Sequence, residues 1–258
     1  MNALIGGAAH TPLRAQVRPV PPLRPLVWLK RGLADFSRCW RQDVAHAALI
    51  VALGWVLLFL LGAHPYFLAA ALSGFLLGAP VMTTGLVELS RRLEAGEPTS
   101  FNDSLTVLER NGPALVRFGV VLAAFAAGWF LVSGVFLNAV LNVPPPDFLE
   151  TFYRGFLDSA TRAQLVSYVG VGAVLALLVF VLSVVTVPAI THAHASAEQA
   201  MVLSIDVVRA SPVAMVLWSV ILVGLTVVGF ATLLFGMIVV IPLLGHATWH
   251  AYRDVVRV

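Results

Sequence analysis

Apolar runs long enough to cross a lipid bilayer occupy most of this chain. A helix needs about 20 consecutive apolar residues to span the hydrocarbon core, and such runs cover residues 44–61, 66–89, 118–141, 165–190 and 213–249. Charged residues make up only 11% of the chain, whereas a soluble domain carries about a quarter. The sequence therefore predicts an all-α, polytopic transmembrane helix bundle.

The last apolar run is too long for one span, and its division decides the topology. We divide it at the stretch "GFATLLFG", where Gly229 and Gly236 offer a turn. This gives spans at about 213–230 and 235–249, and six spans in all. The alternative is a single long, tilted helix and five spans.

The distribution of basic residues favours six spans, because Lys and Arg concentrate on the cytoplasmic side of membrane proteins. With six spans both termini are cytoplasmic, and only Arg154 and Arg162, of 16 basic residues, lie outside. With five spans, Arg253 and Arg257 would also move outside. We therefore expect a multi-pass protein of the bacterial inner membrane with both termini in the cytoplasm.

The domain organisation is simple. Residues 1–27 form a basic, proline-rich segment that we expect to be a disordered cytoplasmic tail, and residues 28–258 form one six-span membrane domain. The lone cysteine, Cys39, allows no internal disulfide. The net charge of +3 is too small to imply a nucleic-acid partner, so the lipid bilayer is the first partner expected.

An internal repeat is visible in the way the spans end. The spans pair into three hairpins, and each second span carries a proline about one turn before its polar end, namely Pro80, Pro188 and Pro242. Polar residues follow at equivalent positions, first Thr84, His192 and His246, and then Glu88, Ser196 and His250.

A short amphipathic stretch precedes each hairpin. Its large apolar residues recur at helical spacing and share one face, with Leu33, Phe36 and Trp40 in the first, Phe101, Leu105 and Leu108 in the second, and Met201, Ile205 and Val208 in the third. The sequence thus predicts three repeated units, each a cytoplasmic interfacial helix followed by a two-span hairpin.

Two histidines four residues apart, His246 and His250, are the candidate metal ligands. They lie on one helix face, and neutral imidazole binds transition metals and haem iron. Under the repeat, Glu88 and His192 are their possible companions at the cytoplasmic rim. The competing interpretation is structural, because Trp249, Tyr252 and Arg253 in the same stretch are typical of helix ends at the membrane boundary.

Three segments together resemble a known family. They are "RGLADFSRCW", "GFLLGAPVMTTGLVELSRRLEAGE" and "IPLLGHATWHAYRDVV", and they are similar to bacterial integral membrane proteins catalogued only as a domain of unknown function. The resemblance covers roughly residues 28–256 and implies a multi-span inner-membrane protein without an established activity. Some relatives are labelled as similar to cytochrome oxidase subunit I, but this chain lacks the span number and the paired mid-membrane histidines that haem ligation requires.

The chain shows no catalytic constellation, since it has no Ser/His/Asp grouping, P-loop or cysteine pair. The first, third, fourth and fifth spans also lack ionisable residues in their centres, which argues against ion-coupled transport. Our leading hypothesis is a non-enzymatic accessory or assembly factor without a cofactor, which binds another membrane protein complex. The alternatives are a metal- or haem-binding membrane protein that uses the C-terminal histidines, and a carrier or channel for an uncharged or lipid-like ligand.

Overall fold

The computed structural model describes residues 15–61, 65–139 and 159–257 and is 86% helical, so the expected all-α class is confirmed. The helices are α1 (Arg24–Leu61), α2 (Pro65–Met82), α3 (Thr84–Ala95), α4 (Phe101–Arg110), α5 (Gly112–Ala139), α7 (Ser159–Ser183), α8 (Thr186–Ala193), α9 (Ala197–Ala210), α10 (Pro212–Ala231) and α11 (Met237–Val255). Two short strands, β1 (Gln16–Val17) and β2 (Val256–Arg257), pair near the two ends of the described chain.

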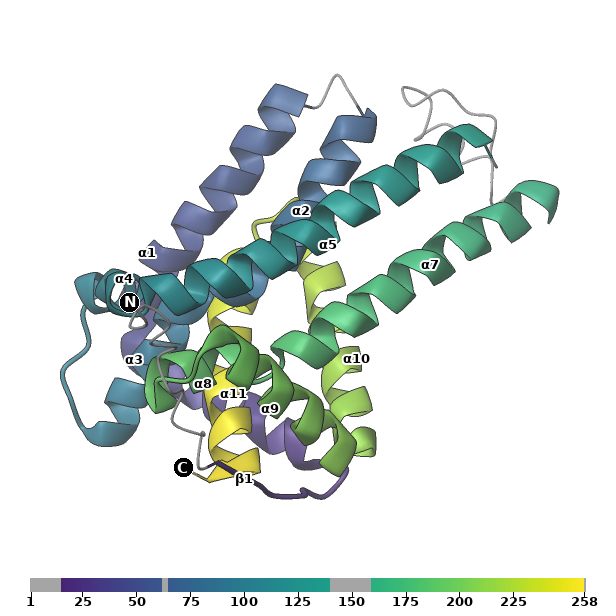
Figure 1. Ribbon diagram of the computed structural model, residues 1–258. Coiled ribbons are helices and arrows are strands. Elements are labelled where there is room, and N and C mark those ends of the chain that lie inside the picture. Colours follow the sequence, from purple (N-terminus) through teal and green to yellow (C-terminus); the bar gives the residue numbers. More distant parts are fainter. Residues whose placement is uncertain (1–14, 62–64, 140–158, 258) are drawn as a thin grey trace, which may run out of the picture.

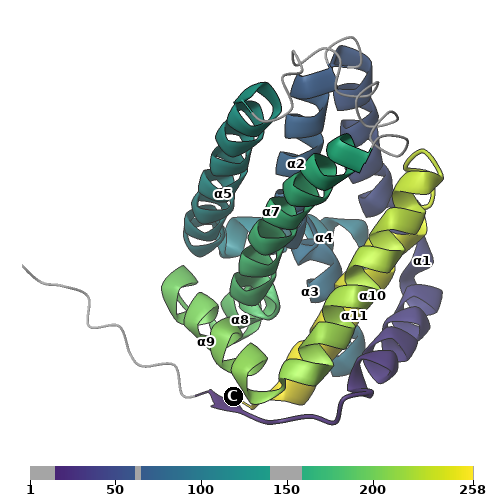
Figure 2. The ribbon, with the colours of Figure 1, turned by 90° about the vertical axis from the view of Figure 1, so that its right-hand side faces the viewer.

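Long helices run side by side away from a cluster of shorter ones (Figure 1). Helices α1, α2, α5 and α7 extend toward one end of the molecule, whereas α3, α4, α8 and α9 gather at the other end (Figures 1 and 2). Both strands lie at this second end, which we call the polar end. The fold therefore separates a region of long apolar helices from a layer of short, more polar ones.

Four helical segments of the described chain are long and apolar enough to cross a membrane. They are Arg24–Leu61, Gly112–Val135, Val166–Ala193 and Pro212–Ala231. Helices α2 and α11 are not among them, and the second half of α11 carries histidine, arginine and aspartate. A membrane protein with several apolar helices is thus confirmed, and the count of six spans stays a prediction.

The last apolar run divides into two helices where the sequence suggested. Helix α10 ends at Ala231 and α11 begins at Met237. The left-handed residues of the turn are Leu233 (φ 52°) and Leu234 (φ 70°) rather than the two glycines. Gly229 serves close packing instead, because a Cβ built on it would lie 2.7 Å from the sulfur of Met237.

The first and last helices of the chain form the most extensive helix pair in the described structure. At its polar end the pair buries Trp28, whose ring meets Trp218 of α10 edge to face at 5.8 Å. Strand β1 pairs antiparallel with β2 beside it. Residues 15–27 therefore differ from the disordered tail that the sequence suggested, because they pair with the C-terminal strand and begin α1.

The helices expected at the membrane interface correspond to the first half of α1, to α4 and to α9. Capping boxes define the starts of the latter two, through Ser100 with Asp103 and Ser196 with Gln199. Small or polar side chains, such as Ser104 and Ser204, face the protein and are fully buried. The large apolar side chains remain at least partly exposed on the outer face, including Leu33, Trp40 and Leu105.

Candidate functional site: a buried polar cluster between the first and last helices

Helix α1 presents three polar side chains on its inner face. Asp35, Cys39 and Asp43 follow one another at intervals of four residues, which places them on one face of the helix, and all three are buried. The backbone of Cys39 is non-helical (φ −125°, ψ 28°), so α1 kinks at the middle residue of this row. The kink lies just before the apolar part of the helix.

Helix α11 faces this row with its two histidines. His246 is fully buried, and the side chain of His250, one turn later, is 14% exposed. The Nε2 atom of His246 lies 2.9 Å from Oδ2 of Asp43, and Nε2 of His250 lies 2.8 Å from Oδ2 of Asp35. Each histidine therefore pairs with its own aspartate of α1.

Ser90 of α3 connects the two histidine–aspartate pairs. Its hydroxyl donates to Oδ2 of Asp35 at 2.7 Å, and its oxygen lies 2.7 Å from Nδ1 of His246. Because the hydroxyl proton is used on Asp35, Ser90 accepts the proton of His246 Nδ1. A continuous chain of hydrogen bonds thus runs from Asp43 through His246, Ser90 and Asp35 to His250.

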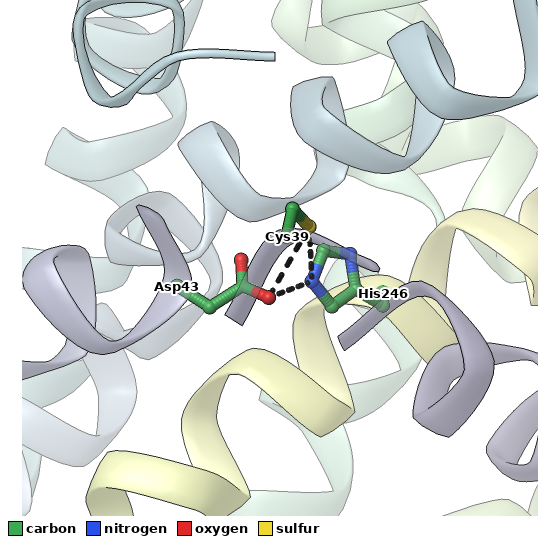
Figure 3. A group of neighbouring side chains, drawn as sticks. All are labelled: Cys39, Asp43 and His246. Carbon is green, nitrogen blue, oxygen red and sulfur yellow. Dashed lines mark hydrogen bonds and ion pairs between the residues drawn. The ribbon is translucent and has the colours of Figure 1, made fainter. Parts of the chain in front are cut away.

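Three potential ligand atoms meet at the inner end of this chain. The Sγ atom of Cys39 lies 3.3 Å from Oδ2 of Asp43 and 3.8 Å from Nε2 of His246, and Figure 3 shows the three side chains facing one another. We call these three residues the Cys–Asp–His cluster. The second oxygen of Asp43, Oδ1, is buried without a hydrogen-bond partner among the described residues.

The four residues predicted to bind a metal lie at three different places in the structure. His246 belongs to the Cys–Asp–His cluster, and His250 pairs with Asp35 next to it. The proposed companions lie elsewhere, since Glu88 and His192 line a separate hollow of about 250 Å³ between α3, α4 and α8. The predicted residues are therefore not one ligand set.

Glu88 is the centre of an arginine network rather than of a metal site. Its buried carboxylate accepts two hydrogen bonds from Arg91, at 2.8 and 2.9 Å, and one from Arg92 at 3.2 Å. Arg110 of α4 approaches the same carboxylate at 3.5 Å. The hydrogen bond to Glu88 is the main cause of the raised pKa of Arg91. The raised pKa favours the charged guanidinium and therefore its ion pair with the Glu88 carboxylate.

The aromatic residues near the C-terminus are buried inside the protein rather than exposed on its surface. Trp249 is 2% and Tyr252 is 0% exposed, and both rings pack around the imidazole of His192 at centroid distances of 5.3 and 5.7 Å. Arg253 pairs with Glu94 of α3 at 3.0 Å. The expected interfacial anchors are therefore core residues, because α3 and α8 cover this part of α11.

Sequence reasoning missed Cys39, Asp43, Asp35 and Ser90 as members of a site. The signal available was the row Asp35, Cys39 and Asp43 at four-residue spacing, directly before an apolar run. We instead interpreted this helix from its apolar face, which carries Leu33 and Trp40. The polar row occupies the opposite, buried face.

The exposed face of α1 carries a stripe of apolar side chains. Leu26, Leu33 and Trp40 follow one another at intervals of seven residues and are 50%, 54% and 52% exposed. Exposed basic residues flank them, namely Lys30, Arg38 and Arg41, and the guanidinium of Arg41 lies over the Trp40 ring. We refer to these three apolar residues as the α1 stripe.

Comparison with known proteins supports the membrane assignment. No curated protein and no solved structure matches the chain. A family model matches residues 67–192, which extend from α2 to α8 and include Ser90 but not the Cys–Asp–His cluster. The chain is therefore similar, over residues 67–192, to the family described as predicted integral membrane protein (DUF2189).

Proposed function

We propose that this chain is a non-enzymatic protein of the bacterial inner membrane that crosses the bilayer six times and binds another membrane protein through its polar end. The observation that carries the proposal is the α1 stripe. An apolar row with basic flanks, on a helix that continues into an apolar span, suits a helical partner that is itself held at the membrane.

The order of the helices supports six spans in three repeated units. The pairs α1 with α2, α5 with α7, and α10 with α11 follow one another among the described helices, and the helices of each pair contact one another. The first half of α1, then α4 and α9, precede these pairs. A helix of 18 residues, such as α2, is about 27 Å long, which is close to the thickness of the hydrocarbon core.

The placement of charge supports a cytoplasmic polar end. Arg24, Arg91, Arg92, Arg110 and Arg253 all belong to ion pairs at this end. At the opposite end of the long helices, Arg162 is the one basic residue within the described ranges. Basic residues mark the cytoplasmic side, so both termini would lie in the cytoplasm.

The spacing of the α1 stripe points to a helix as the bound element. Apolar residues at intervals of seven lie along one seam of a helix, as in helix pairs that pack side by side. The basic flanks favour a partner helix with acidic residues beside its own apolar seam, because complementary charges select the partner and its orientation. The partner class is thus a membrane protein with an acidic amphipathic helix at its cytoplasmic surface.

Site-specific photocrosslinking in living cells tests this proposal. A photoreactive residue at position 33 should form one discrete protein adduct, whereas the same residue at Asn102, exposed on α4, should not. The double charge reversal Arg38→Glu with Arg41→Glu should abolish the adduct without lowering the amount of protein in the membrane. Adducts with lipid alone, or a protein adduct that survives the charge reversal, would contradict it.

A second candidate function is a carrier for an uncharged, lipid-like ligand. A hollow of about 500 Å³ between α2, α4 and α5 is lined by apolar residues and two glycines, including Leu108, Leu115 and Gly119. The space beside Gly119 is open, so Gly119→Leu would fill part of this hollow. Binding of a fluorescent fatty acid that is lost in Gly119→Leu and kept in Gly128→Leu would favour this function.

A further inference from the structure

The Cys–Asp–His cluster has the dimensions of a metal site. For tetrahedral zinc, with bonds of about 2.3 Å to sulfur and 2.0–2.1 Å to nitrogen and oxygen, neighbouring ligand atoms lie about 3.3–3.6 Å apart. The three distances found here are 2.9 Å from nitrogen to oxygen, 3.3 Å from sulfur to oxygen and 3.8 Å from sulfur to nitrogen. Shifts of a few tenths of an ångström would convert one arrangement into the other.

The hydrogen bonds of His246 decide which of its two ring nitrogens faces the cluster with a lone pair. Ser90 accepts the proton of His246 Nδ1, so the Nε2 atom of a neutral His246 carries a lone pair. This lone pair faces the carboxylate of Asp43 at 2.9 Å. Two lone pairs at this distance repel each other unless a cation lies between them, and that cation is either a proton or a metal ion.

The unpartnered oxygen of Asp43 is a second, independent observation. Its side chain is 0% exposed, and Oδ1 has no hydrogen-bond partner among the described residues. A buried carboxylate oxygen without a partner is costly. A metal ion bound by both oxygens of Asp43, by Nε2 of His246 and by Sγ of Cys39 would have four protein ligand atoms and would remove this cost.

We propose that Cys39, Asp43 and His246 bind one divalent transition-metal ion of the zinc class, at the kink of α1 and against α11. A thiolate and a carboxylate together balance the charge of a divalent ion, so the buried complex is neutral. The mixed sulfur, nitrogen and oxygen donors suit zinc or cobalt, whereas magnesium and calcium prefer oxygen alone. This inference does not depend on the α1 stripe or on its partner.

The same geometry distinguishes an ion from haem. The His246 ring is fully buried, with Nδ1 at Ser90 and Nε2 at Asp43. A porphyrin needs an open space several ångströms deep in front of the ligating nitrogen, and Asp43 and Cys39 fill that space here. The four protein ligand atoms would leave no coordination position on the ion for a substrate. Its role would therefore be to join α1 to α11.

Ser90, Asp35 and His250 act on this site as positioning residues. Residues beyond the metal ligands fix the orientation of a ligating histidine, and their loss typically weakens metal binding about 10–100-fold. Ser90 is the direct partner of His246, so Ser90→Ala should have an effect of this size. His250 lies two hydrogen bonds further away, so His250→Gln should bind metal with an affinity within about tenfold of the wild type.

Cobalt binding to the purified full-length protein tests the proposal. After treatment with a chelator, the protein should take up one Co²⁺ per chain and show the absorption of a cobalt–thiolate bond. The chain has one cysteine, so this absorption reports on Cys39 alone. Zinc should displace the cobalt and abolish the absorption.

Variants separate this site from other possibilities. Cys39→Ser, Asp43→Asn and His246→Gln should each lose the cobalt–thiolate absorption, and His192→Gln should keep it as a matched control. The wild-type measurement remains decisive if a variant fails to fold. The proposal is overturned if the wild type takes up no cobalt, if the absorption survives Cys39→Ser, or if His250→Gln removes the metal as completely as His246→Gln.

Discussion

Gly32 of α1 lies in direct contact with the backbone of Ala247 in α11. A Cβ atom built on Gly32 would lie 2.8 Å from the Ala247 nitrogen and 2.9 Å from the carbonyl oxygen of Leu243. The backbones of the two helices therefore touch three residues before Asp35 and one residue after His246. This contact sets the spacing at which the two histidine–aspartate pairs can form.

The first prediction concerns this contact. Gly32→Ala should lower the stability of the protein by about 1–3 kcal/mol, because the added methyl group meets backbone atoms that cannot rotate away. Gly128→Ala on α5 is the matched control, since the space beside that glycine is open. Thermal unfolding in detergent measures both, and equal unfolding temperatures for the two variants would refute the close approach.

The second prediction concerns the buried carboxylate at the centre of the arginine network. Glu88→Gln should cost about 1.5–3 kcal/mol, because it removes charged hydrogen bonds from two half-buried arginines, Arg91 and Arg92. Glu97→Gln removes a contact with the same Arg91 at 2.9 Å, but the Glu97 side chain is 42% exposed and screened by solvent, so its loss should cost less than the loss of Glu88. Unfolding of both variants in one detergent gives the comparison, and the reverse order of effects would contradict the assignment.

The third prediction concerns pH. Burial alone would raise the pKa of Asp254, but hydrogen bonds from Arg24 and Trp28 lower it below its ordinary value of 3.8. A depressed carboxyl pKa contributes stability above the ordinary value, and this contribution is lost as the pH falls through the depressed pKa. Asp254→Asn should therefore unfold at a lower temperature than the wild type at pH 6.

The difference between these two proteins should begin to shrink below about pH 4, where the Asp254 carboxyl of the unfolded chain takes up a proton, and it should vanish as the pH falls through the depressed pKa of the folded protein. Thermal unfolding of both proteins between pH 6 and pH 3 checks this. A difference that is constant over the whole range would mean that packing, rather than the charge of Asp254, stabilises the junction of α1 and α11.

The fourth prediction concerns topology. A reporter that is active only in the cytoplasm should be active when fused after Val258 and silent when inserted at Pro145. An N-terminal fusion serves as the control for a cytoplasmic end. An inactive fusion at Val258 would leave an odd number of spans and would remove the basis for three repeated hairpins.

Much of the secondary structure could be predicted from local sequence, because it depends on local chemistry. Proline directly after a polar segment marks the beginnings of α5 and α10, at Pro113 and Pro212. The long apolar runs predicted membrane-spanning helices, and four helical segments of the described chain are long and apolar enough to cross a membrane. The division of the last run also followed from its length, although leucines rather than glycines take the left-handed turn.

Only the tertiary structure decided which polar side chains meet. His246 and Asp43 are 203 residues apart in sequence, and the periodicity of each helix says only which residues share a face. Whether that face turns toward lipid, water or another helix depends on the sum of many weak packing contacts across the bundle. For this reason the sequence placed Trp249 and Tyr252 at a membrane boundary, whereas α3 and α8 bury them, and it did not single out the inner row of α1 that completes the surroundings of His246.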